Sequence, residues 1–86
     1  MIIIGKIQPF MLKQQIIVTD EDKIIETIMT TMKDLPMYIC NLVQKYNCNN
    51  IQIIGSKKYN QYLKTKIQQY YTTNYTLEQE LNITLA

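Results

Sequence analysis

The sequence predicts an α/β fold in which a small mixed four-stranded sheet has helices packed on it. Three observations predict this class. Runs of β-branched residues bounded by turn residues are typical of buried strands, and apolar residues at helical spacing follow residues that can cap a helix. The stretch 51–86 has a strand–helix–strand pattern, whose crossover makes the two strands parallel. The predicted order is strand, strand, helix, helix, strand, helix, strand.

Two strands are expected at the N-terminus. Residues 2–8 form a continuous run rich in β-branched side chains, which suits a strand buried on both faces. Pro9 interrupts the run, and residues 12–19 predict a second strand. A hairpin around residues 8–11 would join them, although the Asn-Gly pair that favours the tightest hairpins is missing.

Two helices, or one helix kinked at Pro36, are expected next. Thr19 can cap the first helix, and acidic residues follow in its first turn, where the helix dipole favours them. Asp34 can cap the second helix, and Pro36 falls in its first turn. The apolar residues of the first helix are Ile24, Ile25, Ile28, Met29 and Met32. Those of the second are Leu35, Ile39, Leu42, Val43 and Tyr46.

The C-terminal half predicts a strand, a helix and a final strand. Asparagines at positions 47, 49 and 50 end the preceding helix, and a short strand follows to residue 54, closed by Gly55. Ser56 can cap the next helix, and residues 82–85 alternate as a strand. The apolar stripe of this helix is Tyr59, Leu63, Ile67 and Tyr70. The pattern of strand, Gly55 and capped helix resembles part of an RNase H-like or actin-like domain over less than half of the chain, without a motif that assigns either family.

The composition excludes several kinds of chemistry. The chain has 86 residues and a net charge of +2, which fit one domain spanning residues 1–86. It contains no His and no Arg. The absence of His removes the Ser-His and Cys-His nucleophile systems and the usual imidazole metal sites, and the absence of Arg removes the bidentate fork for carboxylates and phosphates. We therefore expect no catalytic residue, no metal, no cofactor and no enzymatic activity.

The residue usage also indicates a source and a compartment. Heavy use of Ile, Lys, Asn, Gln, Thr and Tyr is typical of AT-rich coding sequences, such as those of a low-GC bacterium or a phage or plasmid within one. Cys40 and Cys48 have neither a metal-binding nor a redox spacing, so we expect Cys40 buried in a helix and both thiols reduced, with a disulfide between them as the alternative. No segment has the pattern of a signal peptide or the length of a membrane span. We expect a cytoplasmic protein without membrane contact.

The first candidate site is the turn formed by Gly55, Ser56, Lys57 and Lys58. Ligands of open α/β sheets bind beyond the carboxyl ends of strands, and a helix N-terminus there offers free N–H groups to an anion such as a phosphate or nucleotide. The spacing matches neither common glycine-rich phosphate motif. The alternative is a glycine turn, a serine cap and two solvated lysines.

A second candidate combines lysines and tyrosines of the last helix. Aromatic side chains in a basic field bind single-stranded nucleic acid, although Tyr59 and Tyr70 fall on the stripe assigned to the core. Tyrosine is also a frequent anchor at protein interfaces. For nucleic-acid binding, the expected surface of the last helix also includes Lys57 and Lys58. The version expected to contact a protein consists of Tyr62, Lys64, Lys66, Tyr71 and Tyr75.

Two further clusters have simple structural explanations. Asp20, Asp22 and Glu26 could hold Mg²⁺ on one helix face, but acids in a first helical turn also answer the helix dipole. Met29, Met32 and Met37 could form a soft apolar patch on the first helix pair.

The function expected from these observations is that of a non-enzymatic protein-interaction module. A small regulator or inhibitor from a mobile genetic element, such as a phage, would fit, and self-association into a homo-oligomer is part of this expectation. The alternative is a small nucleotide or phosphate binder that uses residues 55–58. A third hypothesis is a weak nucleic-acid binder that uses the lysine and tyrosine surface.

Overall fold

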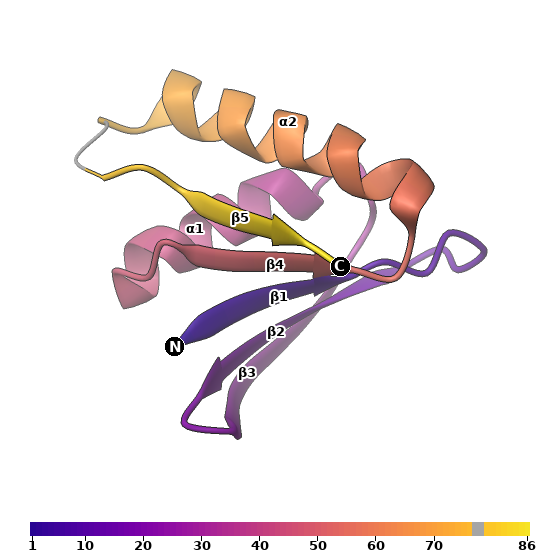
Figure 1. Cartoon of the computed structure of the whole chain (residues 1–86), viewed down its shortest axis with the longest axis horizontal. Coiled ribbons are helices and arrows are strands. Elements are labelled where there is room, and N and C mark those ends of the chain that lie inside the picture. The colour runs from indigo at the N-terminus through magenta and orange to yellow at the C-terminus, as the bar shows by residue number, and fades with distance from the viewer. Residues whose placement is uncertain (77–78) are drawn as a thin grey trace.

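The structure, a computed structural model, describes residues 1–76 and 79–86 and consists of a five-stranded mixed sheet with two helices (Figure 1). The elements are β1 (Ile2–Lys6), β2 (Gln14–Asp20), β3 (Lys23–Thr30), α1 (Leu35–Tyr46), β4 (Asn50–Ile54), α2 (Lys57–Asn74) and β5 (Asn82–Leu85). Their order across the sheet is β3-β2-β1-β4-β5. The β1–β2 and β2–β3 pairs are antiparallel, and β4 is parallel to both β1 and β5. The predicted α/β class is confirmed, with five strands in place of four.

The fifth strand is β3, and the prediction of a helix in this part of the chain is wrong. Glu21 and Asp22 have φ angles of 49° and 65°, and two successive left-handed residues make the tight turn of a β-hairpin. The turn pairs Asp20 with Lys23 and continues β2 into β3. The β-branched residues of β3 fit a strand as well as a helix, so pairing with β2 decides between the two periods. Thr19 accordingly lies inside β2 and caps nothing.

The other predicted elements are confirmed, except that β1 is not buried on both faces: Ile2 and Lys6 are exposed and Ile4 is half-buried, because the helices lie on the other side of the sheet. Strands β1 and β2 form the expected hairpin, and β4, α2 and β5 form the expected parallel unit. Since no helix precedes Asp34, the alternative of one long helix kinked at Pro36 is wrong. Asp34 is the N-cap residue of α1, and Pro36 lies in the first turn. Asn47 ends α1 in the left-handed conformation, with φ 48°. Neither Asp34 nor Ser56 makes a capping hydrogen bond through its side chain.

Both helices lie on one face of the sheet. The crossovers β3–α1–β4 and β4–α2–β5 join parallel strands and advance across the sheet in the same direction, so the right-handed rule places their helices on the same side. Helix α1 lies close to β1: a Cβ atom added to Gly5 would lie only 3.4 Å from Ile39 Cδ1. The core between the layers consists mainly of Ile3, Ile7, Ile16, Val18, Leu35, Ile39, Leu42, Val43, Ile51, Ile53, Leu63 and Ile67.

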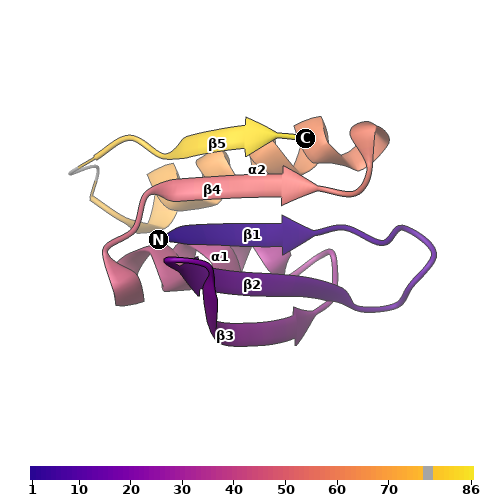
Figure 2. The same ribbon diagram turned by 60° about the horizontal axis from the view of Figure 1, so that its bottom comes forward.

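The opposite face of the sheet, which we call the open face, carries no helix over the described residues (Figure 2). Side chains alternate between the two faces along each strand, and the burial of Ile3 and Gly5 toward the helices places Ile4 on the open face. Strand register extends this assignment into rows. The central row is Thr84, Gln52, Ile4, Ile17 and Thr27. The row toward the β2–β3 turn contains Ile2, Thr19 and Ile24, and the row toward the other end contains Ile54, Lys6, Gln15 and Met29.

Candidate interaction surfaces

The turn at Gly55–Lys58 is built around a close approach of two backbones. Gly55 has a φ of 108°, and a Cβ atom there would lie 2.2 Å from the carbonyl oxygen of Ile7. The amide of Ile7 donates to the carbonyl of Ile54 at 2.8 Å, which holds the ends of β1 and β4 together. The glycine is therefore required for packing. Lys57 and Lys58 are exposed at the start of α2, and their role as an anion site stays a prediction.

The lysine and tyrosine residues expected to contact a partner do not form one surface. Tyr62 is 54% exposed, and Lys66 Nζ lies 5.5 Å from the centroid of its ring. Lys64 is half-buried on the same helix. Tyr71, by contrast, is only 2% exposed and belongs to the core, so its assignment to a contact surface is corrected.

Tyr75 links the end of α2 to α1. Its ring stacks on that of Tyr71, with centroids 5.4 Å apart, and its hydroxyl donates to Asn41 Oδ1 at 2.7 Å. Burial raises the pKa of the Tyr75 hydroxyl above its ordinary value. Cys40, on α1, is also buried, and burial raises the pKa of its thiol to about 12. A thiol held protonated in this way is a packing group and not a nucleophile.

The residues of the predicted acidic and methionine clusters lie apart, because residues 23–30 form a strand and not a helix. Asp22 lies in the β2–β3 turn and Glu26 on the helix-covered face of β3, and no group of three metal-binding side chains occurs among residues 1–76 and 79–86. Met29 lies on the open face and is 52% exposed. Met32 and Met37 line two adjoining hollows near the start of α1, of about 450 and 390 Å³. Lys33, Pro36 and Lys66 are shared by both hollows.

Glu26 fastens β3 to the end of α1. Its Oε1 atom accepts hydrogen bonds from Lys45 Nζ at 2.5 Å and from the Tyr46 hydroxyl at 2.7 Å. These hydrogen bonds, of which the one from Lys45 has the larger effect, hold the pKa of the Glu26 carboxyl below its ordinary value. They also raise the pKa values of Lys45 and Tyr46. Since β3 is an edge strand, this cluster is a main side-chain tie between it and the helical layer.

We expect the Glu26 cluster to make stability fall in acid. A carboxyl whose pKa is lowered on folding stabilises the protein fully above its unfolded pKa of about 4.3, and this contribution is lost as the pH falls through the lower folded value. Urea midpoints measured between about pH 6 and pH 2.5 should therefore decrease more for the wild type than for Glu26→Gln. Glu80→Gln, at an exposed position, is the control and should follow the wild type. Parallel curves for the wild type and Glu26→Gln would contradict the assignment.

The loop between β1 and β2 carries the two most exposed large apolar side chains of the described structure. Phe10 is 101% exposed, Leu12 is 93% exposed and Met11 is 60% exposed. The base of the loop is ordered by Gln14, which is only 1% exposed. Its Oε1 atom accepts from the amide of Gln8, and its Nε2 atom donates to the carbonyls of Gln8 and Met11 at 3.0 Å each. We call Phe10, Met11 and Leu12 the apolar loop tip.

The open face is richer in apolar side chains over β1, β2 and β3, where Lys6, Gln15, Thr19 and Thr27 also lie, than over β4 and β5. We call the first part the apolar half and the second part the amide half. Over β1, β2 and β3 it presents Ile4 and Ile17, together with Ile2, Ile24 and Met29, which are 42%, 65% and 52% exposed. Over β4 and β5 it presents polar side chains around a hollow of about 240 Å³. These are Asn50, Gln52, Asn82 and Thr84. Asn82 Nδ2 donates to Asn50 Oδ1 at 3.3 Å.

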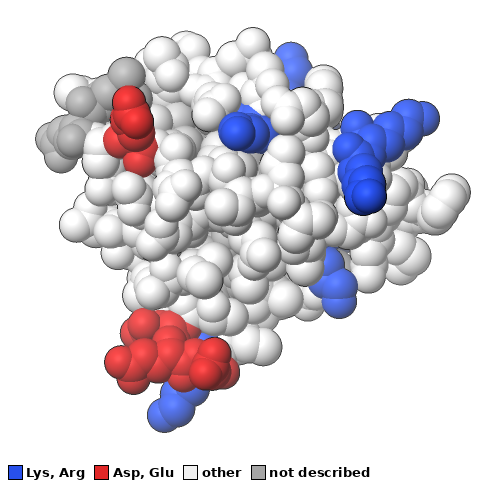
Figure 3. All heavy atoms as spheres, in the orientation of Figure 1, with Lys and Arg blue, Asp and Glu red and all other residues white. Residues whose placement is uncertain are grey.

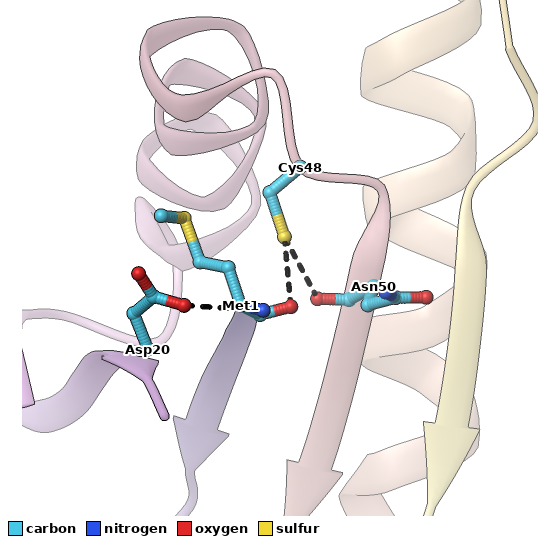
Figure 4. A network of polar contacts seen from close by, with 4 residues as sticks. All are labelled: Met1, Asp20, Cys48 and Asn50. Atoms are coloured by element: carbon cyan, nitrogen blue, oxygen red, sulfur yellow. Dashed lines mark hydrogen bonds and ion pairs between the residues drawn. The ribbon is translucent and has the colours of Figure 1, made fainter. Parts of the chain in front are cut away.

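Charges are separated along the strand direction. Figure 3 shows carboxylates gathered at the β2–β3 turn and several lysines at the opposite end of the molecule. Residues 20–23 contain three acids and one lysine, whereas Lys6 and Lys13 stand at the other end with no acid between residues 1 and 19. The acidic end is tied to the start of β1 and to the segment between α1 and β4, because the Met1 amino group lies 3.7 Å from Asp20 and Cys48 Sγ donates to the Met1 carbonyl at 3.3 Å (Figure 4).

Sequence reasoning missed the apolar loop tip and the open face. The signal for the first was an apolar run beside Pro9, outside the alternation of either strand. The open face depended on the identity of β3. Neither helix in the described ranges has the length and apolar content needed to cross a bilayer. No family model matches the chain, no curated protein matches it, and no solved structure matches it.

Proposed function

We propose that this protein works by binding another protein, as a small non-enzymatic regulator or inhibitor. The observation that supports the proposal is the apolar loop tip, where Phe10 and Leu12 are held in solvent on a loop that a buried glutamine orders. Exposing two large apolar side chains is unfavourable unless a partner covers them. Residue usage supports an origin in a mobile genetic element of a low-GC host and a place in its cytoplasm.

The loop tip has the features of a binding anchor. Both the oxygen and the nitrogen of the Gln14 side-chain amide are hydrogen-bonded to the loop backbone, so the loop conformation is set before a partner binds. A preorganised loop loses less conformational entropy on binding than a flexible one. Aromatic and large aliphatic side chains that enter a pocket on the partner supply most of the energy at protein interfaces. The loop therefore suits an apolar pocket or cleft on another protein.

The proposal is tested by affinity capture from lysate of the source cell, with mass spectrometry of the retained proteins. We expect the wild type to retain a specific protein and Phe10→Ser/Leu12→Ser to lose it. Both side chains are almost fully exposed, so the double variant should keep its free energy of unfolding to within about 0.5 kcal/mol per site.

The matched control is Tyr62→Ser, which removes an aromatic ring that is 54% exposed on α2. Retention by this variant, together with loss in the loop variant, would assign binding to the loop tip. The opposite result would assign it to the lysine and tyrosine surface. Turnover of a substrate by the purified protein, abolished by one substitution, would contradict the proposal altogether.

A further inference from the structure

We propose that the open face binds the open face of a second copy of this chain, in a two-fold dimer whose facing strands run in opposite directions. The first argument is the lack of cover. The sheet has helices on one face only among the described residues. Its other face leaves Ile24 and Met29 more than half exposed. Contiguous apolar surface of this kind on a sheet is the usual mark of an interface.

The second argument is that the face matches itself under this symmetry. A two-fold axis that lies in the interface and crosses the strands at right angles reverses the strands but keeps each strand over its own counterpart. The apolar half over β1, β2 and β3 then meets an apolar half, and the amide half meets an amide half. Ile24 of one copy lies over Met29 of the other, because they occupy opposite end rows of β3. Side-chain amides both donate and accept, so the amide halves can pair with each other.

The third argument is charge. The same axis places the acidic turn of one copy, residues 20–23, over the end of the other copy that bears Lys6 and Lys13. This contact occurs twice, once at each end of the dimer. A two-fold axis parallel to the strands would instead place acid over acid and lysine over lysine, so electrostatic complementarity selects the antiparallel arrangement. The net charge of +2 per copy is too small to oppose association strongly.

The fourth argument is area. Five strands at about 4.8 Å spacing and about five residues in length give a flat face on the order of 400 Å² per copy. Because protruding side chains make the accessible surface larger than this flat area, the two copies together bury on the order of 1,200 Å², which is the lower limit for stable interfaces. We therefore expect a dimer that dissociates on dilution, with its sheets about 10 Å apart.

The proposal is tested by sedimentation velocity of the full chain between about 10 µM and 1 mM. The apparent mass should rise from 10.2 kDa toward twice that value. The Ile24→Lys/Met29→Lys variant should stay monomeric, with circular dichroism confirming that it is folded. The Phe10→Ser/Leu12→Ser variant should still dimerise, which separates this inference from the proposed function. A wild type that stays monomeric at 1 mM would overturn the inference.

Charge complementation tests the orientation. Lys6→Glu/Lys13→Glu and Glu21→Lys/Asp22→Lys should each dimerise at least about tenfold more weakly than the wild type at low salt, since like charges then meet at both ends. An equimolar mixture of the two should recover wild-type affinity. Lys57→Glu/Lys58→Glu has the same net charge as the first variant but lies at the start of α2, and it should dimerise as the wild type does. A mixture that fails to recover would overturn the antiparallel arrangement.

A cysteine placed near the centre of the open face tests the surface itself. Gln52 lies beside Ile4 in the central row, so two copies of Gln52→Cys should face each other across the roughly 10 Å between the sheets and be joined by a short bis-maleimide crosslinker, a span that a direct disulfide does not cover. A dimer joined through its β3 edges would hold these residues about seven strand spacings, or roughly 34 Å, apart. Gln61→Cys, on the exposed side of α2, should give no link, and neither should the wild type with its two buried thiols. Dimerisation without a Gln52→Cys link would overturn the assignment to the open face.

Discussion

Gly55→Ala is expected to lower the free energy of unfolding by about 3 kcal/mol or more. Two costs act together. The φ of 108° is strained for any residue with a side chain, and the added Cβ would lie 2.2 Å from the Ile7 carbonyl oxygen. That oxygen belongs to a backbone segment fixed by the hydrogen bond from the Ile7 amide to Ile54. The clash therefore cannot be relieved by a change of rotamer.

Thermal unfolding measures this effect against a matched glycine. Gly5→Ala adds the same methyl group at a position where the new Cβ would lie 3.0 Å from Ile53 Cδ1, the tip of a flexible side chain. We expect it to cost about 1 kcal/mol, or roughly 4–8 °C in melting temperature for a domain of this size. Gly55→Ala should lower the melting temperature at least twice as much. Equal melting temperatures for the two variants would contradict the close approach at Gly55.

The elements with one dominant local pattern could be predicted from the sequence. Helix α1 follows from Asp34, Pro36 and a clean apolar period, and the turn into α2 follows from Gly55. Strand β3 could not be predicted in this way, because its isoleucines and threonines fit both a helical and a strand period. The acids at its start also suit a first helical turn. The choice depends on hydrogen bonds to β2, a partner that no local pattern specifies.

The candidate site was less predictable than the fold, because exposure depends on tertiary packing. Tyr62 and Tyr71 are equivalent as residue types, yet one is 54% exposed and the other 2%. The apolar loop tip depends on Gln14, whose side chain turns inward to bind the loop backbone. A glutamine at the start of a strand gives no signal of that role. Residue type thus predicted an interaction protein, while only the packing shows which large apolar side chains are exposed.

Asn60→Asp is expected to destabilise the protein by about 3 kcal/mol or more at neutral pH, and less in acid. Asn60 is 2% exposed, and its Nδ2 atom donates to the carbonyls of Ile53 at 3.3 Å and Ala86 at 3.0 Å. These bonds tie α2 to the ends of β4 and β5. Its Oδ1 atom is buried and has no hydrogen-bond partner within the described residues. An aspartate would replace the donor with a carboxylate that faces two carbonyl oxygens away from water.

The pH dependence distinguishes this mechanism from simple loss of contacts. Burial and repulsion would raise the pKa of the new carboxyl in the folded state above its unfolded value of about 3.9. The folded state then binds the proton more tightly, so the variant is closest to the wild type below that value and loses stability as the pH rises through the raised folded pKa. Asn60→Ala removes the same donor without a charge and should cost about 1–3 kcal/mol at every pH. If urea denaturation from about pH 3.5 to pH 8 gave the two variants the same pH dependence relative to the wild type, the Asn60 amide would not be facing the two carbonyls as described.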